Sequence, residues 1–304
     1  MEARDLVIVG GGPAGLTAGL YAARARLDVV MIERLSPGGQ MLNTDMVENW
    51  PGDVEAVNGF DLSERMRKHA LKFDLEIVGN EVSGIGIDGD YKVVRTPKGD
   101  IRCRALVLCP GASPRKLGVP GEAELTGKGV SYCGTCDGPF FREQDVACIG
   151  GGDTAVEEAM FLTKFATKVY LIHRRDQLRA TGILAERVLQ NDKIEVLWSQ
   201  APLAFSGENG VESVRLRKLK DNTEYDLAVQ GAFVFVGTVP NTQFLNGVVE
   251  MDQEGFIITD KKQETSVPGV FAAGDCCAKI LRQIVTAAGE GATAAFAAQR
   301  YLED

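Results

Sequence analysis

The sequence predicts an α/β fold in which one strand–turn–helix–strand unit occurs twice. The 304-residue chain is 45% hydrophobic and 25% charged, as in ordinary globular proteins, and its length favours two domains. Residues 10–35 and 150–175 align with each other without a gap. Each copy follows an apolar run and contains a glycine-rich turn, a stretch of helical period and a second apolar run. Two such copies predict two Rossmann-like dinucleotide-binding domains.

The composition excludes several classes of partner. A net charge of −9 argues against nucleic acid and against anionic membranes, because both need a basic surface. No apolar run approaches the roughly 18 residues that span a bilayer, and the first residues pass into a strand without a secretory signal. The seven cysteines lack the spacing of a disulfide framework, so we expect a cytoplasmic protein. The two histidines, His69 and His173, are too far apart to form a metal site.

The first copy begins with an apolar run at residues 6–9, which we expect to form a strand. Its turn comprises Gly10, Gly12, Pro13, Ala14 and Gly15. The first glycine allows a tight turn, the second lets the backbone approach a pyrophosphate, and the third lets the helix pack on its strand. The unpaired N–H groups at the start of the helix suit phosphates. Glu33 ends the second strand, and its carboxylate suits ribose hydroxyls, so this copy predicts an FAD site.

The second copy has the same turn but a different residue at the end of its second strand. Its turn comprises Gly150, Gly152, Asp153, Thr154 and Ala155. The carboxylate is replaced by His173, Arg174 and Arg175, with Arg179 a little further on. Grouped guanidiniums suit a 2′-phosphate, which a carboxylate would repel. The alternative is a solvated basic segment, but we favour an NADPH site.

A Cys-x-x-Cys motif lies between the two copies, at Cys133 and Cys136. When the first cysteine opens a helix, the two sulfurs can form a disulfide, and the helix N-terminus favours a reactive thiolate. Half of a zinc site or two buried thiols are the alternatives, but no second Cys-x-x-Cys completes a zinc site. Asp137 either exchanges a proton with a leaving thiolate or makes a local cap hydrogen bond.

The C-terminal segment predicts a third element of a cofactor site. A strand at residues 269–273 ends in Gly274 and Asp275, which places a carboxylate within reach of ribityl hydroxyls. Arg282 and Gln283 then lead into a helix of small residues at 284–301. The helix N-terminus suits a flavin ring on which reduction develops negative charge. An ordinary terminal strand–helix pair is the alternative.

With these motifs, the whole chain resembles the low-molecular-weight thioredoxin reductases. The matching segments are Gly10–Gly15, Gly38-Gly39-Gln40, Glu48-Asn49-Trp50-Pro51-Gly52, Cys133–Asp137, Gly150–Ala155, His173–Arg175 with Arg179, Gly237–Asn241, Gly269–Asp275 and Arg282-Gln283.

The resemblance implies a homodimer that passes electrons from NADPH through FAD and a Cys133–Cys136 disulfide to thioredoxin. It places Cys136 next to the flavin and assigns Cys133 to the partner disulfide. It adds Gly39, Gln40 and Asn49 to the FAD-binding residues. It also implies a discontinuous FAD domain, residues 1–114 and 242–304, with an NADPH domain at 115–241 inserted into it.

The chain departs from the family pattern at a few positions. Cys109 replaces the alanine of an Ala-Thr-Gly strand end, Cys276 and Cys277 follow Asp275, and Gly134 stands where another small residue is usual. We expect these three cysteines to be small buried side chains. A second redox pair at 276–277 is the alternative, although a disulfide between neighbours is strained. Two other functions stay open: a related flavin disulfide oxidoreductase acting on a small dithiol or a peroxiredoxin-type partner, and a non-catalytic flavin redox sensor.

Overall fold

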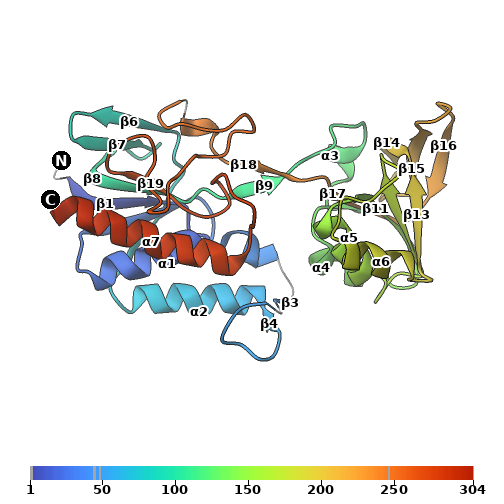
Figure 1. The fold of residues 1–304 in the computed structure, drawn as a ribbon, viewed down its shortest axis with the longest axis horizontal. Coiled ribbons are helices and arrows are strands. Elements are labelled where there is room, and N and C mark those ends of the chain that lie inside the picture. The colour runs from blue at the N-terminus through green and yellow to red at the C-terminus, as the bar shows by residue number, and fades with distance from the viewer. Residues whose placement is uncertain (1–2, 44–45, 48, 246, 304) are drawn as a thin grey trace. The chain divides into compact units, whose positions relative to one another are not determined.

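The computed structural model describes residues 3–43, 46–47, 49–245 and 247–303, without the side chains of residues 43, 46, 135 and 136. The chain forms two compact units, Met1–Ser113 with Val239–Asp304 and Pro114–Thr238. The two connecting segments, β9 (Ala112–Pro114) and β18 (Thr238–Pro240), pair as a two-stranded ribbon. Figure 1 shows the elements of each unit.

The first unit is built on a parallel sheet in which β5, β2, β1 and β8 lie in that order. These strands are β1 (Arg4–Val9), β2 (Val29–Glu33), β5 (Glu76–Gly79) and β8 (Ile101–Leu108). β8 pairs with β1 along one edge and is long enough to pair with two strands along its other edge. Its residues 106–108 pair in parallel with β19 (Val270–Ala272), and its residues 101–103 pair with β7 (Tyr91–Arg95), which continues into β6 (Gly84–Asp88). The C-terminal strand therefore ends at the same edge as β1 and β2.

Three helices cover one face of this sheet: α1 (Pro13–Arg24), α2 (Gly59–Leu71) and α7 (Ile284–Glu303). Proline at the first position of α1 fits, because that N–H has no partner within a helix. Asn58 caps α2 by accepting hydrogen bonds from the backbone N–H groups of Phe60 (2.9 Å) and Asp61 (3.3 Å). The remaining short elements of the unit are η1 (Gly39–Asn43), β3 (Met46–Val47), β4 (Val57–Asn58) and η3 (Gln243–Leu245).

The second unit repeats the plan with a parallel sheet in the order β10, β17, β11, β12 and β13. These strands are β10 (Val130–Ser131), β11 (Asp145–Gly150), β12 (Lys168–His173), β13 (Ile194–Trp198) and β17 (Gly231–Phe235). α5 (Asp153–Leu162) and α6 (Gly182–Leu189) pack on one face. The antiparallel strands β14 (Gln200–Ser206), β15 (Ser213–Lys218) and β16 (Glu224–Ala228) contribute to the core on the other. Short helices α3 (Glu122–Leu125), α4 (Gly134–Asp137) and η2 (Gly138–Phe141) complete it.

Equivalent elements of the two units derive from the two sequence copies. β1, α1 and β2 of the first unit correspond to β11, α5 and β12 of the second, and every predicted strand and helix of the copies is present. The predicted α/β class with two Rossmann-like domains is confirmed. Within the described residues, no helix combines the length and the apolar character that crossing a membrane requires.

Candidate nucleotide and disulfide sites

In the first glycine-rich turn, neither the backbone conformation nor a close contact within the described structure requires glycine at position 12. Gly10 needs its positive φ of 99°, and its N–H donates to the Ile32 carbonyl at 2.8 Å. Gly12 has an ordinary φ of −71°, and a Cβ placed there would find its nearest described atom, Gly39 Cα, at 3.9 Å. The space beside Gly12 is therefore open at the start of α1, as a phosphate held by helix N–H groups would need.

The second turn shows the same feature. Gly152 has a φ of −93°, and a Cβ there would meet no described atom within 4 Å. No intramolecular contact in the described structure explains glycine at this position. Both turns thus fit a group from outside the chain that lies directly against the backbone, as the pyrophosphate of a dinucleotide does.

Glu33 lies directly beneath the first turn. Its Oε2 accepts a hydrogen bond from the Gly11 N–H (2.7 Å) and its Oε1 from the Leu35 N–H (2.9 Å). The Gly38 N–H donates to the Gly11 carbonyl at 2.7 Å, so the segment before η1 lies against the first glycine-rich turn. These contacts hold the carboxylate at the carboxyl end of β2, where ribose hydroxyls bind in such folds.

Asp275 follows β19 and has an unsatisfied buried oxygen. Its Oδ1 has no hydrogen-bond partner among the described residues, and the Lys279 ammonium lies 3.8 Å away. Burial is the main cause that raises the pKa of this carboxyl, while Lys279 and Arg282 act to lower it. An enclosed acceptor without a donor fits a ligand hydroxyl such as one from a ribityl chain.

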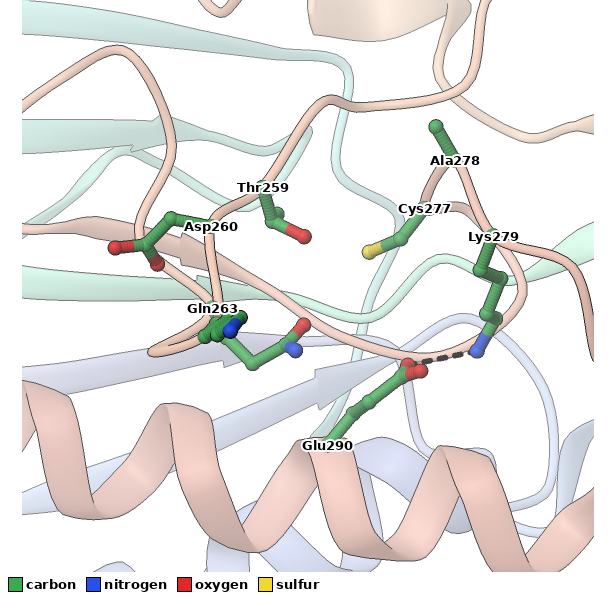
Figure 2. Close-up of a pocket in the computed structure, with 8 residues that line it drawn as sticks. Thr259, Asp260, Gln263, Cys277, Ala278, Lys279 and Glu290 are labelled. Carbon is green, nitrogen blue, oxygen red and sulfur yellow. Dashed lines mark hydrogen bonds and ion pairs between the residues drawn. The ribbon is translucent and has the colours of Figure 1, made fainter.

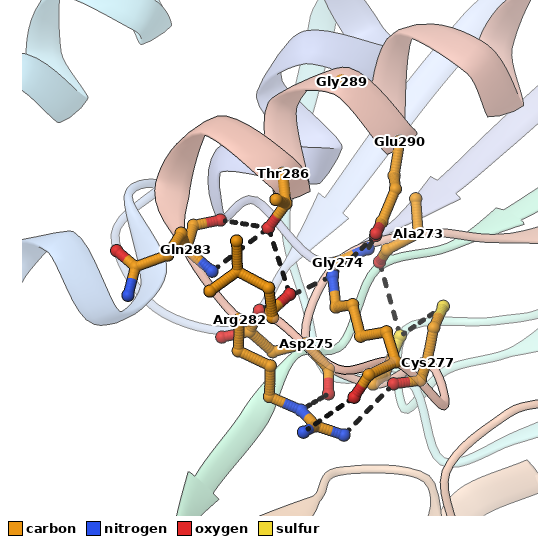
Figure 3. Close-up of polar contacts among 12 residues, drawn as sticks. Ala273, Gly274, Asp275, Cys277, Arg282, Gln283, Thr286, Gly289 and Glu290 are labelled. Carbon is orange, nitrogen blue, oxygen red and sulfur yellow. Dashed lines mark hydrogen bonds and ion pairs between the residues drawn. The ribbon is translucent and has the colours of Figure 1, made fainter. Parts of the chain in front are cut away.

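Two residues that the motifs did not suggest position this strand end. Glu290 of α7 accepts a hydrogen bond from the Gly274 N–H (2.8 Å), as Figure 3 shows, and pairs with Lys279 (2.7 Å). The same pair lines a pocket of about 400 Å³ together with Asp260, Gln263 and neighbouring residues, drawn in Figure 2. No spacing in the sequence relates residue 274 to residue 290, so this link depends on the tertiary fold.

The side chain of Arg282 makes its hydrogen bonds to the backbone of its own loop. Its guanidinium donates to the carbonyls of Asp275 (3.3 Å), Cys277 (3.3 Å) and Lys279 (3.4 Å) and lies 4.0 Å from the centroid of the Phe256 ring. In Figure 3 these bonds converge on the turn after β19. The structure thus shows Arg282 shaping the loop that carries Asp275.

Three other residues predicted to bind the cofactor, Gln40, Asn49 and Gln283, make hydrogen bonds within the first unit. Asn49 donates from Nδ2 to Oε1 of Gln283, just before α7, at 2.9 Å. Gln40 donates from Nε2 to the Ala112 carbonyl at 3.2 Å. Asn49 and Gln283 are distant in sequence, and the fold brings them together.

In the second unit, His173 takes the place of Glu33. Its ring is buried beneath Gly151, and a Cβ on that glycine would overlap the ring. Nε2 lies 2.9 Å from the Gln177 carbonyl, and burial is the main cause that lowers the pKa of His173. The Arg179 N–H donates to the Gly151 carbonyl at 2.6 Å, and Asp153 Oδ1 accepts from the Thr181 N–H at 2.7 Å. These hydrogen bonds connect the basic segment, residues 173–181, to the second glycine-rich turn.

The guanidiniums of this segment face solvent. Arg174, Arg175 and Arg179 are all exposed. Among the described residues of the unit, the ion pairs lie on strands β12, β13, β15 and β16, and none involves these three arginines. Unpaired cations next to an open glycine turn fit a dinucleotide with an additional phosphate.

The redox motif follows β10. Cys133 is disulfide-bonded, and its N–H donates to the Ser131 hydroxyl at 3.0 Å. The backbone of Cys136 lies in α4, and its side chain is outside the described residues. Asp137 ends α4 half-buried, and its N–H donates to the Cys133 carbonyl at 3.3 Å. The motif therefore holds a disulfide-bonded cysteine directly before the short helix α4.

Glu122 and Tyr132, which the sequence did not indicate, link the segment just before Cys133 to residues 117–118. Glu122 is 3% exposed and accepts hydrogen bonds from the N–H groups of Leu117 (2.8 Å) and Gly118 (2.6 Å) and from the Tyr132 hydroxyl (2.8 Å). Burial, followed by the Glu122 carboxylate, raises the pKa of Tyr132 to about 12. No motif marks Glu122, because its partners come from two separate segments, residues 117–118 and Tyr132.

The other cysteines of the described structure are buried and free. Cys109, Cys276 and Cys277 are 5%, 0% and 2% exposed, as expected of small core side chains. The sulfurs of Cys276 and Cys277 lie 3.9 Å apart, and the hydrogen bond with Cys276, followed by burial, raises the pKa of Cys277 far above its usual range. A strongly raised thiol pKa disfavours the reactive thiolate.

A family model described as pyridine nucleotide-disulphide oxidoreductase matches residues 4–291. The chain belongs to this family. The chain is similar to a thioredoxin reductase from Peptoclostridium acidaminophilum, with 46% identity across 98% of this chain and 97% of the relative. Another, from Bacillus subtilis, is 45% identical across 99% and 95%.

The thioredoxin reductase structure from Lactococcus lactis is 41% identical, covers 99% of both chains and superposes with a TM-score of 0.91. The resemblance to low-molecular-weight thioredoxin reductases is therefore confirmed. As a member of the pyridine nucleotide-disulphide oxidoreductases, the protein is an oxidoreductase that uses a flavin and a pyridine nucleotide.

Proposed function

We propose that the protein is an NADPH-dependent thioredoxin reductase, in which electrons pass through FAD and a Cys133–Cys136 pair to thioredoxin. The observation that carries this proposal is the disulfide at Cys133 in the same unit as a glycine turn with unpaired arginines. Each part of the proposal assigns a task to particular side chains.

FAD would be held by the unit formed from both ends of the chain, residues 1–114 and 242–304. The open turn from Gly10 to Gly15 would bind its pyrophosphate, Glu33 its ribose hydroxyls and Asp275 its ribityl chain. Gly39, Gln40, Asn49, Gly274, Arg282 and Gln283 complete the proposed site. When bound, the flavin supplies the chemistry that links two-electron oxidation of the nicotinamide to reduction of a disulfide.

NADPH would be held by the inserted unit, residues 115–241. The turn of Gly150, Gly152, Asp153, Thr154 and Ala155 would bind the pyrophosphate at the start of α5. Arg174, Arg175 and Arg179 would bind the 2′-phosphate with charge-assisted hydrogen bonds. His173 would position this segment through its contact with the Gln177 carbonyl.

The reduced pair would act on thioredoxin by thiol–disulfide exchange. The Cys133 thiolate attacks one sulfur of the partner disulfide, which forms a mixed disulfide and releases the other partner sulfur as a thiolate. The Cys136 thiolate then attacks Cys133, which restores the Cys133–Cys136 disulfide and releases the second partner thiolate. Asp137 would give a proton to a leaving thiolate. Two electrons thus move from the pair to the partner.

We also propose a homodimer in the cytoplasm. The free buried cysteines of the described structure suit a reducing compartment. Sedimentation at equilibrium tests the oligomeric state.

The decisive experiment uses the purified flavoprotein with a bacterial thioredoxin and follows NADPH oxidation. We expect turnover that depends on oxidised thioredoxin and is much slower with NADH. Absence of thioredoxin-dependent NADPH oxidation by a protein that contains bound FAD would overturn the proposal. A small disulfide and a peroxiredoxin serve as comparison substrates.

A further inference from the structure

A second carboxyl group lies directly behind the redox pair. Gly134 follows Cys133 and is buried, and a Cβ placed on it would overlap Oε2 of Glu158. Glu158 belongs to α5, which packs against α4. The carboxyl group of Glu158 therefore occupies the space that a side chain at position 134 would fill.

This carboxyl group is only partly satisfied. Oε2 of Glu158 is enclosed and has no hydrogen-bond partner among the described residues. Burial, followed by the like charge of Glu157, raises the pKa of Glu158 to about 7, while the Gly134 N–H acts to lower it. Glu158 is thus poised to change its charge near neutral pH.

Among the described groups, the charge that raises the pKa of Glu158 is that of Glu157. The other elements packed against α5 carry Glu186 and Arg187 on α6, Lys168 and His173 on β12, and Asp145 on β11. Glu157 is its neighbour on α5, and Cys148 on β11 has a pKa raised well above its usual value by burial and by Glu158. The adjoining α4 segment contributes Cys133 and Asp137. The nearby Phe235 of β17 lies 3.6 Å from the position of a Gly134 Cβ and carries no charge. A new negative charge in this setting would favour the protonated form of Glu158.

Reduction of the disulfide at Cys133 creates such a charge. Two electrons from the flavin break the S–S bond and leave two thiolates, of which one or both take up protons. Any thiolate that remains at Cys133 adds negative charge beside Gly134, whose Cβ position overlaps the Glu158 carboxyl group, and a nearby like charge raises the pKa of a carboxyl. We propose that Glu158 binds a proton from solvent when the Cys133 disulfide is reduced and returns it when the disulfide is formed again. Glu158 is then a positioning residue that couples proton uptake to the redox state of the pair.

This inference rests on the proposed redox function of the pair, and it concerns a different group from Asp137. Linkage gives it a measurable consequence. Between the pKa of Glu158 in the oxidised protein, about 7, and its higher pKa in the reduced protein, reduction takes up one proton more than it would if Glu158 did not titrate. The dithiol-to-disulfide ratio then changes by a further factor of ten per pH unit, equivalent to about 30 mV for a two-electron couple.

The test is a redox titration of the holoenzyme in dithiothreitol buffers from pH 6 to pH 9. The fraction of reduced Cys133 is read by acid quenching, alkylation and mass spectrometry. We expect the wild type to show the additional tenfold dependence above pH 7 and Glu158→Gln to lack it. Reduced-minus-oxidised infrared spectra should show a carboxylic acid C=O band in the wild type that Glu158→Gln lacks.

Two further variants separate proton coupling from a loss of charge or of folding. Glu157→Gln removes the same charge one residue away. It should keep the additional dependence but start it at lower pH, because Glu157 raises the pKa of Glu158. Gly134→Ala leaves Glu158 in place but pushes its flexible carboxyl end aside, and it should weaken the dependence.

The outcomes distinguish this inference from the proposed function. If Cys133 cycles normally and the wild type and Glu158→Gln have the same pH dependence, the inference is overturned and the proposed function stands. If Cys133 does not cycle in any form of the protein, both are overturned. Should Glu158→Gln fail to fold, the wild-type infrared band and the Gly134→Ala titration decide, and a wild type without the band contradicts the inference.

Discussion

Glu33 and His173 lie at equivalent positions beneath the two glycine-rich turns. The Glu33 carboxylate accepts the Gly11 N–H at 2.7 Å, whereas the His173 ring fills the space beside Gly151 and meets the Gln177 carbonyl at 2.9 Å. One chain geometry thus presents a carboxylate at one nucleotide turn and a basic segment at the other. We therefore expect the two turns to bind different dinucleotides.

The unpaired arginines predict the choice of nicotinamide cofactor. Replacing Arg174 and Arg175 with alanine should raise the KM for NADPH roughly 10- to 100-fold, because each charge-assisted hydrogen bond contributes about 1.5–3 kcal/mol. The KM for NADH should change little, since NADH has no 2′-phosphate. Arg187→Ala, an exposed arginine on α6, is the matched control and should change neither constant. Equal effects of the double variant on NADPH and NADH would contradict the 2′-phosphate assignment.

The two cysteines of the motif predict separable half-reactions. Cys133→Ser and Cys136→Ser should each retain FAD and its reduction by NADPH, measured by loss of flavin absorbance, and should each lose thioredoxin reduction. The Cys133→Ser protein alone should fail to trap a mixed disulfide with thioredoxin. The double variant Cys276→Ala/Cys277→Ala should keep most of the activity, because both thiols are buried in the core. Complete loss in that variant would instead support a second redox pair.

We expect the substitution Asp275→Asn to weaken flavin binding and to stabilise the apoprotein. Asp275→Asn removes a buried charge, so the Kd for FAD should rise roughly 10-fold or more, as expected for a lost charged hydrogen bond. The raised pKa of Asp275 means that its ionised form destabilises the fold, so the Tm of the apoprotein should increase near pH 7. Glu254→Gln, exposed in the same unit, should alter neither. A lower apoprotein Tm for Asp275→Asn would show that the carboxylate is structural.

Glu158 predicts a pH-dependent stability of the oxidised protein. Its pKa rises from 4.5 to about 7 on folding, so the carboxyl disfavours the folded state increasingly as the pH rises from 4.5 through 7. The cost reaches at most about 3 kcal/mol. Glu158→Gln lacks this cost, so its Tm advantage over the wild type should grow between pH 5 and pH 8. Glu186→Gln, on an exposed residue of α6, should show no such trend. A pH-independent difference for Glu158→Gln would contradict the buried titration.

The sequence by itself determined the features that depend on neighbouring residues. Glycine spacing at 10–15 and 150–155, the apolar runs around it and the Cys-x-x-Cys motif are local patterns. They predicted the α/β class, the two repeated units and the elements of each copy, because strand and helix periodicity and turn geometry are properties of short segments.

The tertiary structure alone decided which distant groups meet. It joins Gly274 to Glu290, Asn49 to Gln283 and Gly134 to Glu158, and it turns the Arg282 guanidinium onto the carbonyls of its own loop. No local pattern encodes these contacts, because each depends on how separate helices and loops pack and on which polar atoms that packing encloses. Burial also sets the proton affinity of Glu158 and Asp275, since the cost of removing a charge from water arises only once the surrounding chain has folded.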